Sequence, residues 1–255
     1  MPAPINRFKA SLAQGEMQYG CWAGFADPYA TEVLATAGFD WLVIDGEHAP
    51  NDLRSIMHQL QVLDGKHSHP VVRLPVGNEW LIKQVLDVGA QTLLIPMVET
   101  VDQARDLVRA MRYPPEGIRG SGAALARASR FSEITDYVKT ANDQMCLLVQ
   151  VETMKGIHAL DDILALDGVD GVFIGPSDLA ADMGYLGNSA EPAVRDVIKN
   201  ALERISASSK AAGILAVDPA TAADYKTWGA QFLAVGIDVV MLAKAARATV
   251  AHWKG

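Results

Sequence analysis

The stretch FDWLVIDGEH (residues 39–48) is a short apolar run that leads directly to Asp45 and His48. A run without polar alternation predicts a strand buried on both faces, as in a parallel sheet covered by helices. Chemically active side chains also stand at the carboxyl ends of three similar runs: VVRLP (71–75) with Arg73, LLVQVE (147–152) with Gln150 and Glu152, and GVFIGPSD (171–178) with Ser177 and Asp178. This distribution indicates one shared mouth at the carboxyl ends of the strands.

Eight apolar runs are predicted to be strands: 19–24, 40–45, 70–74, 92–97, 145–152, 171–175, 214–217 and 232–236. Between them apolar residues recur at helical spacing, for example over 53–63 and 194–205, and an amphipathic helix over 4–13 precedes them all. This alternation predicts an α/β fold, a (β/α)8 TIM barrel that forms one domain over 1–255. A doubly wound parallel sheet has the same local pattern and is the alternative fold.

Composition narrows the class of protein. Lys and Arg total 22 and Asp and Glu total 30, so the net charge is −8 and argues against nucleic acid as a partner. Cys21 and Cys146 lie inside strand-like runs and are predicted to be buried thiols in a reducing compartment. The sequence has no apolar run of about 18 residues and no apolar stretch of secretory length near Met1, so we expect a cytoplasmic protein without a membrane partner.

One segment, YPPEGIRGSGAALARASRF (113–131), interrupts the alternation with two prolines, three glycines and three arginines. Segments of this length between elements are usually functional or interfacial, and the alternative is a solvated insertion. Gly117, Gly120 and Gly122 do not form a GxGxxG motif between a strand and its helix. The segment therefore does not predict dinucleotide binding.

Glu152 and Asp178 follow consecutive predicted strands and could share one metal ion. Mg²⁺ and Mn²⁺ prefer oxygen ligands and often take only one or two carboxylates, with water and substrate completing the octahedron. Neighbouring strands lie about 4.8 Å apart, which suits a shared ion. The alternative is that Glu152, and Ser177 with Asp178, merely cap the helices that follow them.

His48 and Arg73 are candidates for proton transfer and charge stabilisation. Of the six histidines, His48 alone stands just beyond a predicted strand end, where an imidazole could act as a general base. The alternative for His48 is a hydrogen bond with Asp45 in a turn. Arg73 could stabilise an oxyanion at the mouth, and its alternative is a salt bridge to Asp45 or Glu47.

The turn Gly175-Pro176-Ser177 precedes a predicted helix, and backbone donors in such a position bind carboxylates well. None of the predicted strands contains a lysine, so Schiff-base chemistry has no candidate residue. Carbanion chemistry in this chain would therefore have to use a metal.

Six motifs occur in order along the chain: FDWLVIDGEHAP, VVRLP, LIPMVET, YPPEGIRG, QVET and FIGPSDLA. Together they resemble the 4-hydroxy-2-oxoheptanedioate aldolase (HpcH/HpaI) family of class II pyruvate aldolases. The resemblance implies a TIM barrel that assembles as a hexamer from two trimers, with a C-terminal helix exchanged between neighbours. It also implies a divalent cofactor, Mg²⁺, Mn²⁺ or Co²⁺.

The resemblance further implies a role for each matching residue. These roles are Glu152 and Asp178 as metal ligands, His48 as base, Arg73 as transition-state stabiliser, Asp45 within the same catalytic group, and Gln150, Gly175, Pro176, Ser177 and Asp178 as pyruvate-binding positions. Asp87 matches an acidic residue that a neighbouring subunit presents to the histidine. Trp22, Leu215 and Val217 would line the mouth and select the aldehyde.

The predicted reaction is reversible cleavage of a 4-hydroxy-2-oxo acid, such as 4-hydroxy-2-oxoheptanedioate, to pyruvate and an aldehyde. The metal would stabilise a pyruvate enolate, and His48, directly or through metal-bound water, would remove the 4-hydroxyl proton. Rival substrates are 2-dehydro-3-deoxy-sugar acids and citramalyl-type coenzyme A esters. A basic groove for coenzyme A phosphates would have to use Arg112, Arg119, Arg127 and Arg130. A non-catalytic, oxo-acid-binding barrel is the alternative from another class.

Overall fold

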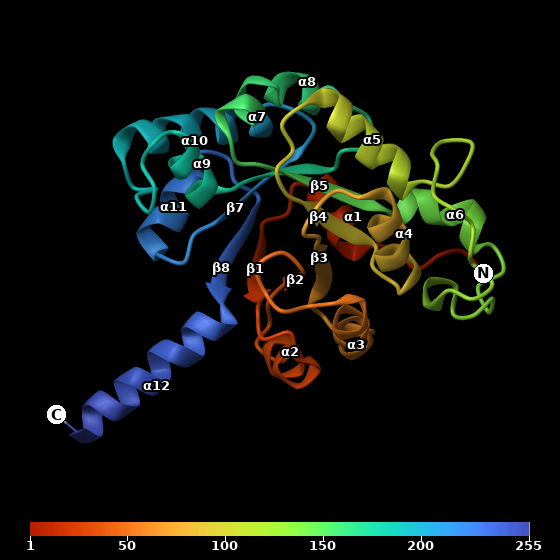
Figure 1. The fold of residues 1–255 in the computed structure, drawn as a ribbon, viewed down its shortest axis with the longest axis horizontal. Coiled ribbons are helices and arrows are strands. Elements are labelled where there is room, and N and C mark those ends of the chain that lie inside the picture. The colour runs from red at the N-terminus through yellow and green to blue at the C-terminus, as the bar shows by residue number, and fades with distance from the viewer. Residues whose placement is uncertain (255) are drawn as a thin grey trace.

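Eight parallel strands close into a barrel in the computed structural model, which describes residues 1–254 (Figure 1). The strands are β1 (Gln18–Ala23), β2 (Trp41–Asp45), β3 (His69–Arg73), β4 (Thr92–Ile95), β5 (Cys146–Val151), β6 (Gly171–Ile174), β7 (Ala211–Leu215) and β8 (Phe232–Ile237). Each strand pairs with its neighbours in chain order, and β8 pairs with β1 to complete the circle. The predicted TIM barrel is confirmed, and closure rules out the doubly wound sheet.

The helices surround the barrel, except for α1 at its amino-terminal end and α12, which projects away from it (Figure 1). They are α1 (Arg7–Ala13), α2 (Pro28–Ala35), α3 (Leu53–Leu63), α4 (Glu79–Asp87), α5 (Val101–Met111), α6 (Tyr137–Gln144), α7 (Met154–His158), α8 (Leu160–Leu164), α9 (Pro176–Asp182), α10 (Pro192–Ser206), α11 (Pro219–Thr227) and α12 (Asp238–Lys254), with a 3-10 turn, η1 (Arg127–Ser129). No helix among residues 1–254 is both long and apolar enough to span a bilayer.

The barrel interior is filled by aromatic rings. Trp22, Trp41, Phe173 and Phe232 contact one another with ring centroids 5.6 to 6.5 Å apart. Phe8 of α1 closes the amino-terminal end, because its ring lies 5.8 Å from Trp41 and 5.9 Å from Phe232. Burial of each such ring stabilises the fold by about 2–3 kcal/mol.

Two predicted starts were each wrong by three residues. The first helix begins at Arg7 and not at residue 4, because the Asn6 side chain accepts a hydrogen bond from the Lys9 backbone N–H and caps it. Strand β7 begins at residue 211 and not at 214, because small residues at 211–213 gave no apolar signal. Gly213 is required there: a Cβ would lie 2.2 Å from the Phe232 ring.

The segment over 113–131 packs against the barrel through several buried side chains, so it is not simply a solvated insertion. Arg119 is buried, its guanidinium carbon lies 4.4 Å from the Tyr113 ring centroid, and Nη2 donates to Asp87 Oδ1 at 2.7 Å. The free thiols of Cys21 and Cys146 are buried as predicted, and burial raises the pKa of Cys21 to about 12.

Candidate active site

The carboxyl ends of β2 and β3 bring Asp45 and Arg73 side by side, since these residues are register partners in the sheet. Arg73 Nε donates to Asp45 Oδ1 at 2.9 Å and Nη2 donates to Oδ2 at 2.7 Å, so the pair is bidentate. Arg73 Nη1 lies 2.7 Å from Glu47 Oε2. Both salt bridges considered from the sequence are present, and together they fix the guanidinium plane.

Burial and charge act in opposite directions on the acids beside Arg73. Burial alone would raise the pKa of Asp45, but hydrogen bonds and charge from Arg73 hold it below its ordinary value. Burial raises the pKa of Glu47, although Arg73 and His48 oppose this shift. Asp45 is thus a firmly ionised partner of Arg73, and Glu47 is the more easily protonated carboxyl.

The imidazole of His48 stands at the mouth with 68% of its side chain exposed. Its Nε2 atom lies 3.8 Å from Glu47 Oε2. The turn with Asp45 exists only through the backbone, because the His48 N–H donates to Asp45 Oδ1 at 3.3 Å. The ring is therefore accessible to a molecule bound at the mouth.

Glu152 lies at the end of β5 and is 2% exposed. Its Oε1 accepts a hydrogen bond from the Met97 backbone N–H at 2.8 Å, and its Oε2 accepts one from Gln150 Nε2. Thr153, not Glu152, caps α7, since Thr153 Oγ1 accepts from the Gly156 N–H at 3.2 Å. The capping alternative for Glu152 is therefore wrong.

Asp178 lies in the first turn of α9, where no side chain caps the helix. Ser177 and Asp178 therefore make no capping hydrogen bond, although Asp178 stands in the first turn, where the helix dipole favours an acid. Gly175 brings this turn against Glu152, because a Cβ at Gly175 would lie 2.3 Å from Glu152 Oε2. Burial raises the pKa of Glu152, and the nearby charges of Asp178 and Glu47 raise it further. The site thus brings the acidic side chains of Glu47, Glu152 and Asp178 near one another.

Two features of this site were missed from the sequence. Met97 has φ of +56° and uses this left-handed conformation to direct its N–H to Glu152. No residue pattern signals a left-handed methionine. Glu47 was considered only as a partner of Arg73, although its position directly before His48 could have identified it as part of the site.

Of the three residues predicted to line the mouth, Trp22 and Leu215 lie inside the barrel and Val217 lies outside it. Trp22 is 7% exposed and lies beneath Arg73, whose guanidinium carbon is 5.0 Å from the indole centroid. Leu215 packs against the interior aromatic cluster. Val217 borders a shallow hollow outside the barrel with Tyr19 and Val235. Trp22 therefore supports Arg73 from inside the barrel.

Comparison with known proteins places this geometry in a family. The model of the HpcH/HpaI aldolase/citrate lyase family matches residues 18–245. The chain belongs to this family. A hydroxypyruvate/pyruvate aldolase of Roseovarius nubinhibens is 73% identical over 254 residues, covering 100% of this chain and 99% of that protein. A 4-hydroxy-2-oxo-heptane-1,7-dioate aldolase of Salmonella arizonae is 54% identical over 248 residues, covering 97% of this chain and 94% of that protein.

The fold comparison agrees. The crystal structure of an HpcH/HpaI aldolase/citrate lyase family protein from Burkholderia cenocepacia has a TM-score of 0.94 and 40% identity, and the match covers 98% of this chain and 100% of that one. The resemblance deduced from the motifs is thus confirmed. The part of the chain that matches the HpcH/HpaI family contains every candidate site residue.

The four arginines considered for coenzyme A phosphates do not form a groove at this mouth. Arg119 is buried in its ion pair with Asp87. Arg112 lies 3.6 Å from Glu116, while Arg127 and Arg130 line a cavity near the amino-terminal ends of β3 and β4. Their placement removes the physical basis that the sequence offered for a coenzyme A ester.

Proposed function

We propose that the protein is a metal-dependent class II aldolase that reversibly cleaves 4-hydroxy-2-oxo acids to an aldehyde and pyruvate or hydroxypyruvate. The observation that carries the proposal is the convergence of Arg73, Glu152 and Asp178 at one mouth of the barrel. Pyruvate and hydroxypyruvate both appear in the names of several relatives, which supports these two 2-oxo acids as products of the cleavage.

The residues present fit a divalent cation such as Mg²⁺, Mn²⁺ or Co²⁺. Glu152 is a buried acid whose pKa is raised, and Gln150 Oε1 is buried without a hydrogen-bond partner within residues 1–254. Residues 1–254 contain no cluster of three His, Cys, Asp or Glu side chains that could hold a metal ion without other ligands. Glu152 and Asp178 would therefore hold the ion together with water and substrate, as hard cations accept. When bound, the ion would supply positive charge to the 2-oxo acid oxygens.

The chain's own residues account for the remaining chemistry. Arg73, fixed by Asp45 and Glu47, presents a cation to the oxygen that becomes negative as the C3–C4 bond breaks. His48 accepts the proton of the substrate 4-hydroxyl, directly or through a water. Backbone N–H groups in the first turn of α9 lack acceptors within the helix and bind the substrate carboxylate.

Chelation should abolish aldol cleavage, and Mg²⁺, Mn²⁺ or Co²⁺ should restore it. Pyruvate or hydroxypyruvate and a panel of aldehydes serve as substrates, and borohydride should trap no covalent pyruvate adduct because no strand lysine faces the site. The same assay separates an enzyme from a non-catalytic oxo-acid-binding barrel. Full activity after thorough metal depletion would overturn the class II assignment.

Assembly forms a further part of the proposal. We propose a hexamer of two trimers in which α12 is exchanged between subunits and Asp87 of one subunit approaches His48 of another. Leu242 and Trp253 of the projecting α12 are 58% and 81% exposed, which supports a partner for this helix. Asp87 ends α4 on the outside of the barrel, and within its own chain it lies in an ion pair with the buried Arg119.

Asp87→Asn tests both roles of Asp87. It leaves the buried Arg119 guanidinium without its countercharge, so we expect a loss of about 2–4 kcal/mol in the free energy of unfolding by urea. At temperatures where the variant remains folded, the shared site predicts lower turnover and a shifted pH profile.

Asp64→Asn is the matched control. Asp64 is 64% exposed and pairs with Arg127 at 3.1 Å, so its loss should cost less than about 1 kcal/mol. An unchanged pH profile in Asp87→Asn, or a fully active monomer by light scattering, would contradict the shared site.

A further inference from the structure

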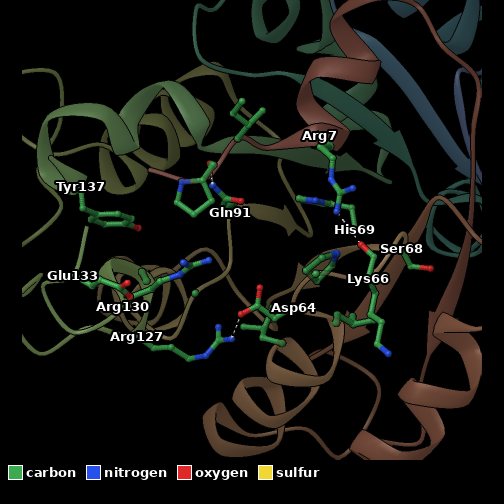
Figure 2. Close-up of a pocket in the computed structure, with 18 of the residues that line it drawn as sticks. Arg7, Asp64, Lys66, Ser68, His69, Gln91, Arg127, Arg130, Glu133 and Tyr137 are labelled. Atoms are coloured by element: carbon green, nitrogen blue, oxygen red, sulfur yellow. Dashed lines mark hydrogen bonds and ion pairs between the residues drawn. The ribbon is translucent and has the colours of Figure 1, made fainter. Parts of the chain in front are cut away.

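A second cavity, of about 540 Å³, lies far from the mouth. It is bordered by the end of α3, the starts of β3 and β4, the N-terminal segment and the segment around η1 (Figure 2). Strand β3 relates the two places, because it begins at His69 in the cavity and ends at Arg73 in the candidate active site. The cavity therefore opens at the opposite end of the barrel and is a separate feature.

Positive charge gathers around this cavity in a chain of net charge −8. The lining residues include four cations and two acids: Arg7, Lys66, Arg127 and Arg130, with Asp64 and Glu133. Arg127 pairs with Asp64 at 3.1 Å, and Arg7 Nη2 donates to the backbone oxygen of Lys66 at 2.9 Å. The side chains of Lys66 and Arg130 make no ion pair within residues 1–254.

His69 adds an uncharged ring to the lining. The Thr92 hydroxyl oxygen accepts a hydrogen bond from Asn6 Nδ2 at 3.0 Å and lies 2.8 Å from His69 Nε2. Burial and the charge of Arg7 lower the pKa of His69 to about 3, and the ring is neutral at pH 7.

The backbone that carries Arg130 is held in an unusual conformation. Arg130, Phe131 and Ser132 have φ of 51°, 55° and 74°, and left-handed non-glycine residues cost about 1–2 kcal/mol each. Two hydrogen bonds retain the turn: the Arg130 N–H donates to the Arg127 carbonyl at 2.8 Å, and the Ser132 N–H donates to Ser129 Oγ at 3.1 Å. The fold therefore keeps a cation at the cavity border at an energetic cost.

We propose that this cavity binds a small polyvalent oxyanion, a phosphorylated or polycarboxylate metabolite. The positive charges around the cavity repel each other, and a bound anion would offset this repulsion because each cation attracts it. Guanidinium groups match phosphate and carboxylate oxygens with paired N–H donors, and the cavity volume is that of a small-molecule site. The lining places these donors on several sides of one space (Figure 2).

Isothermal titration of the full chain with inorganic pyrophosphate and with citrate tests the proposal and distinguishes phosphate from carboxylate ligands. We expect saturable binding of at least one probe with a Kd below about 1 mM at low salt, and weaker binding as salt is added. The variant Lys66→Ala/Arg130→Ala should weaken binding at least about tenfold, because it removes two cations of the lining without breaking an ion pair.

Arg105→Ala/Lys226→Ala is the matched control. It removes the same charge from exposed positions on α5 and α11, outside the cavity, and breaks only the exposed pair of Arg105 with Asp102. It should leave the Kd within about twofold of the unmodified chain. Absence of saturable binding, binding that persists in Lys66→Ala/Arg130→Ala, or equal loss in both double variants would each overturn the proposal. The titrations read binding and not turnover, so the result does not depend on the proposed aldolase activity.

Discussion

Glu152→Gln is expected to lose divalent-metal binding and more than about a hundredfold of aldol activity. Substitutions outside the ligand set of metalloenzymes already cost about 10- to 100-fold, and this one removes a proposed ligand. Glutamine preserves the side-chain shape, so the Met97 N–H can still find an oxygen acceptor. Titration calorimetry with Mn²⁺ and a pyruvate–aldehyde assay measure the two effects.

Glu152→Gln should lose activity, but it should not lose stability in the absence of metal. The folded state raises the pKa of Glu152, so ionised Glu152 destabilises the metal-free fold at pH 7. Removal of the charge should therefore maintain or raise the Tm without metal and abolish the rise in Tm that metal produces. Asp178→Asn should likewise lose metal binding.

Thr153→Ala separates metal ligation from helix capping. Thr153 caps α7, so its truncation should cost about 1 kcal/mol of stability and leave metal affinity near normal. The ligand hypothesis fails if Glu152→Gln binds Mn²⁺ with unchanged affinity. It also fails if Glu152→Gln and Thr153→Ala change metal affinity and stability by the same amounts.

Arg73→Lys is expected to lower turnover by about 10²- to 10³-fold with metal binding retained. A lysine keeps one positive charge but cannot donate to both oxygens of Asp45 while it contacts Glu47. The oxyanion would lose a positioned donor, which costs about this factor in other enzymes. The loss should appear mainly in kcat, because the interaction grows as charge develops.

Arg105→Lys provides a comparison, since Arg105 is an exposed residue of α5 paired with Asp102. It should leave turnover unchanged. Near-normal kcat in Arg73→Lys would assign Arg73 a purely structural role as the partner of Asp45 and Glu47.

Much of the candidate site followed from the sequence because its residues lie at strand ends. Asp45, Arg73 and Glu152 stand directly at or after apolar runs, and parallel strands in one barrel end on one face. The site could be assembled without knowledge of any tertiary contact. The strand starting at Ala211 was less predictable, because small residues give no periodic signal, and the Phe232 ring leaves no room for a side chain at Gly213.

Whereas the structure decided that the strands close into a barrel, the sequence by itself determined the eight-fold alternation and the end of the strands at which Arg73, Glu152 and Asp178 gather. These properties depend on local periodicity, which is written in consecutive residues. Only the tertiary structure decided that Asp45 and Glu47 both hold Arg73, that the Met97 N–H binds Glu152, and that Arg130 and Lys66 face one cavity. These contacts join segments far apart in the chain, and their geometry depends on packing and backbone conformation that no local pattern encodes.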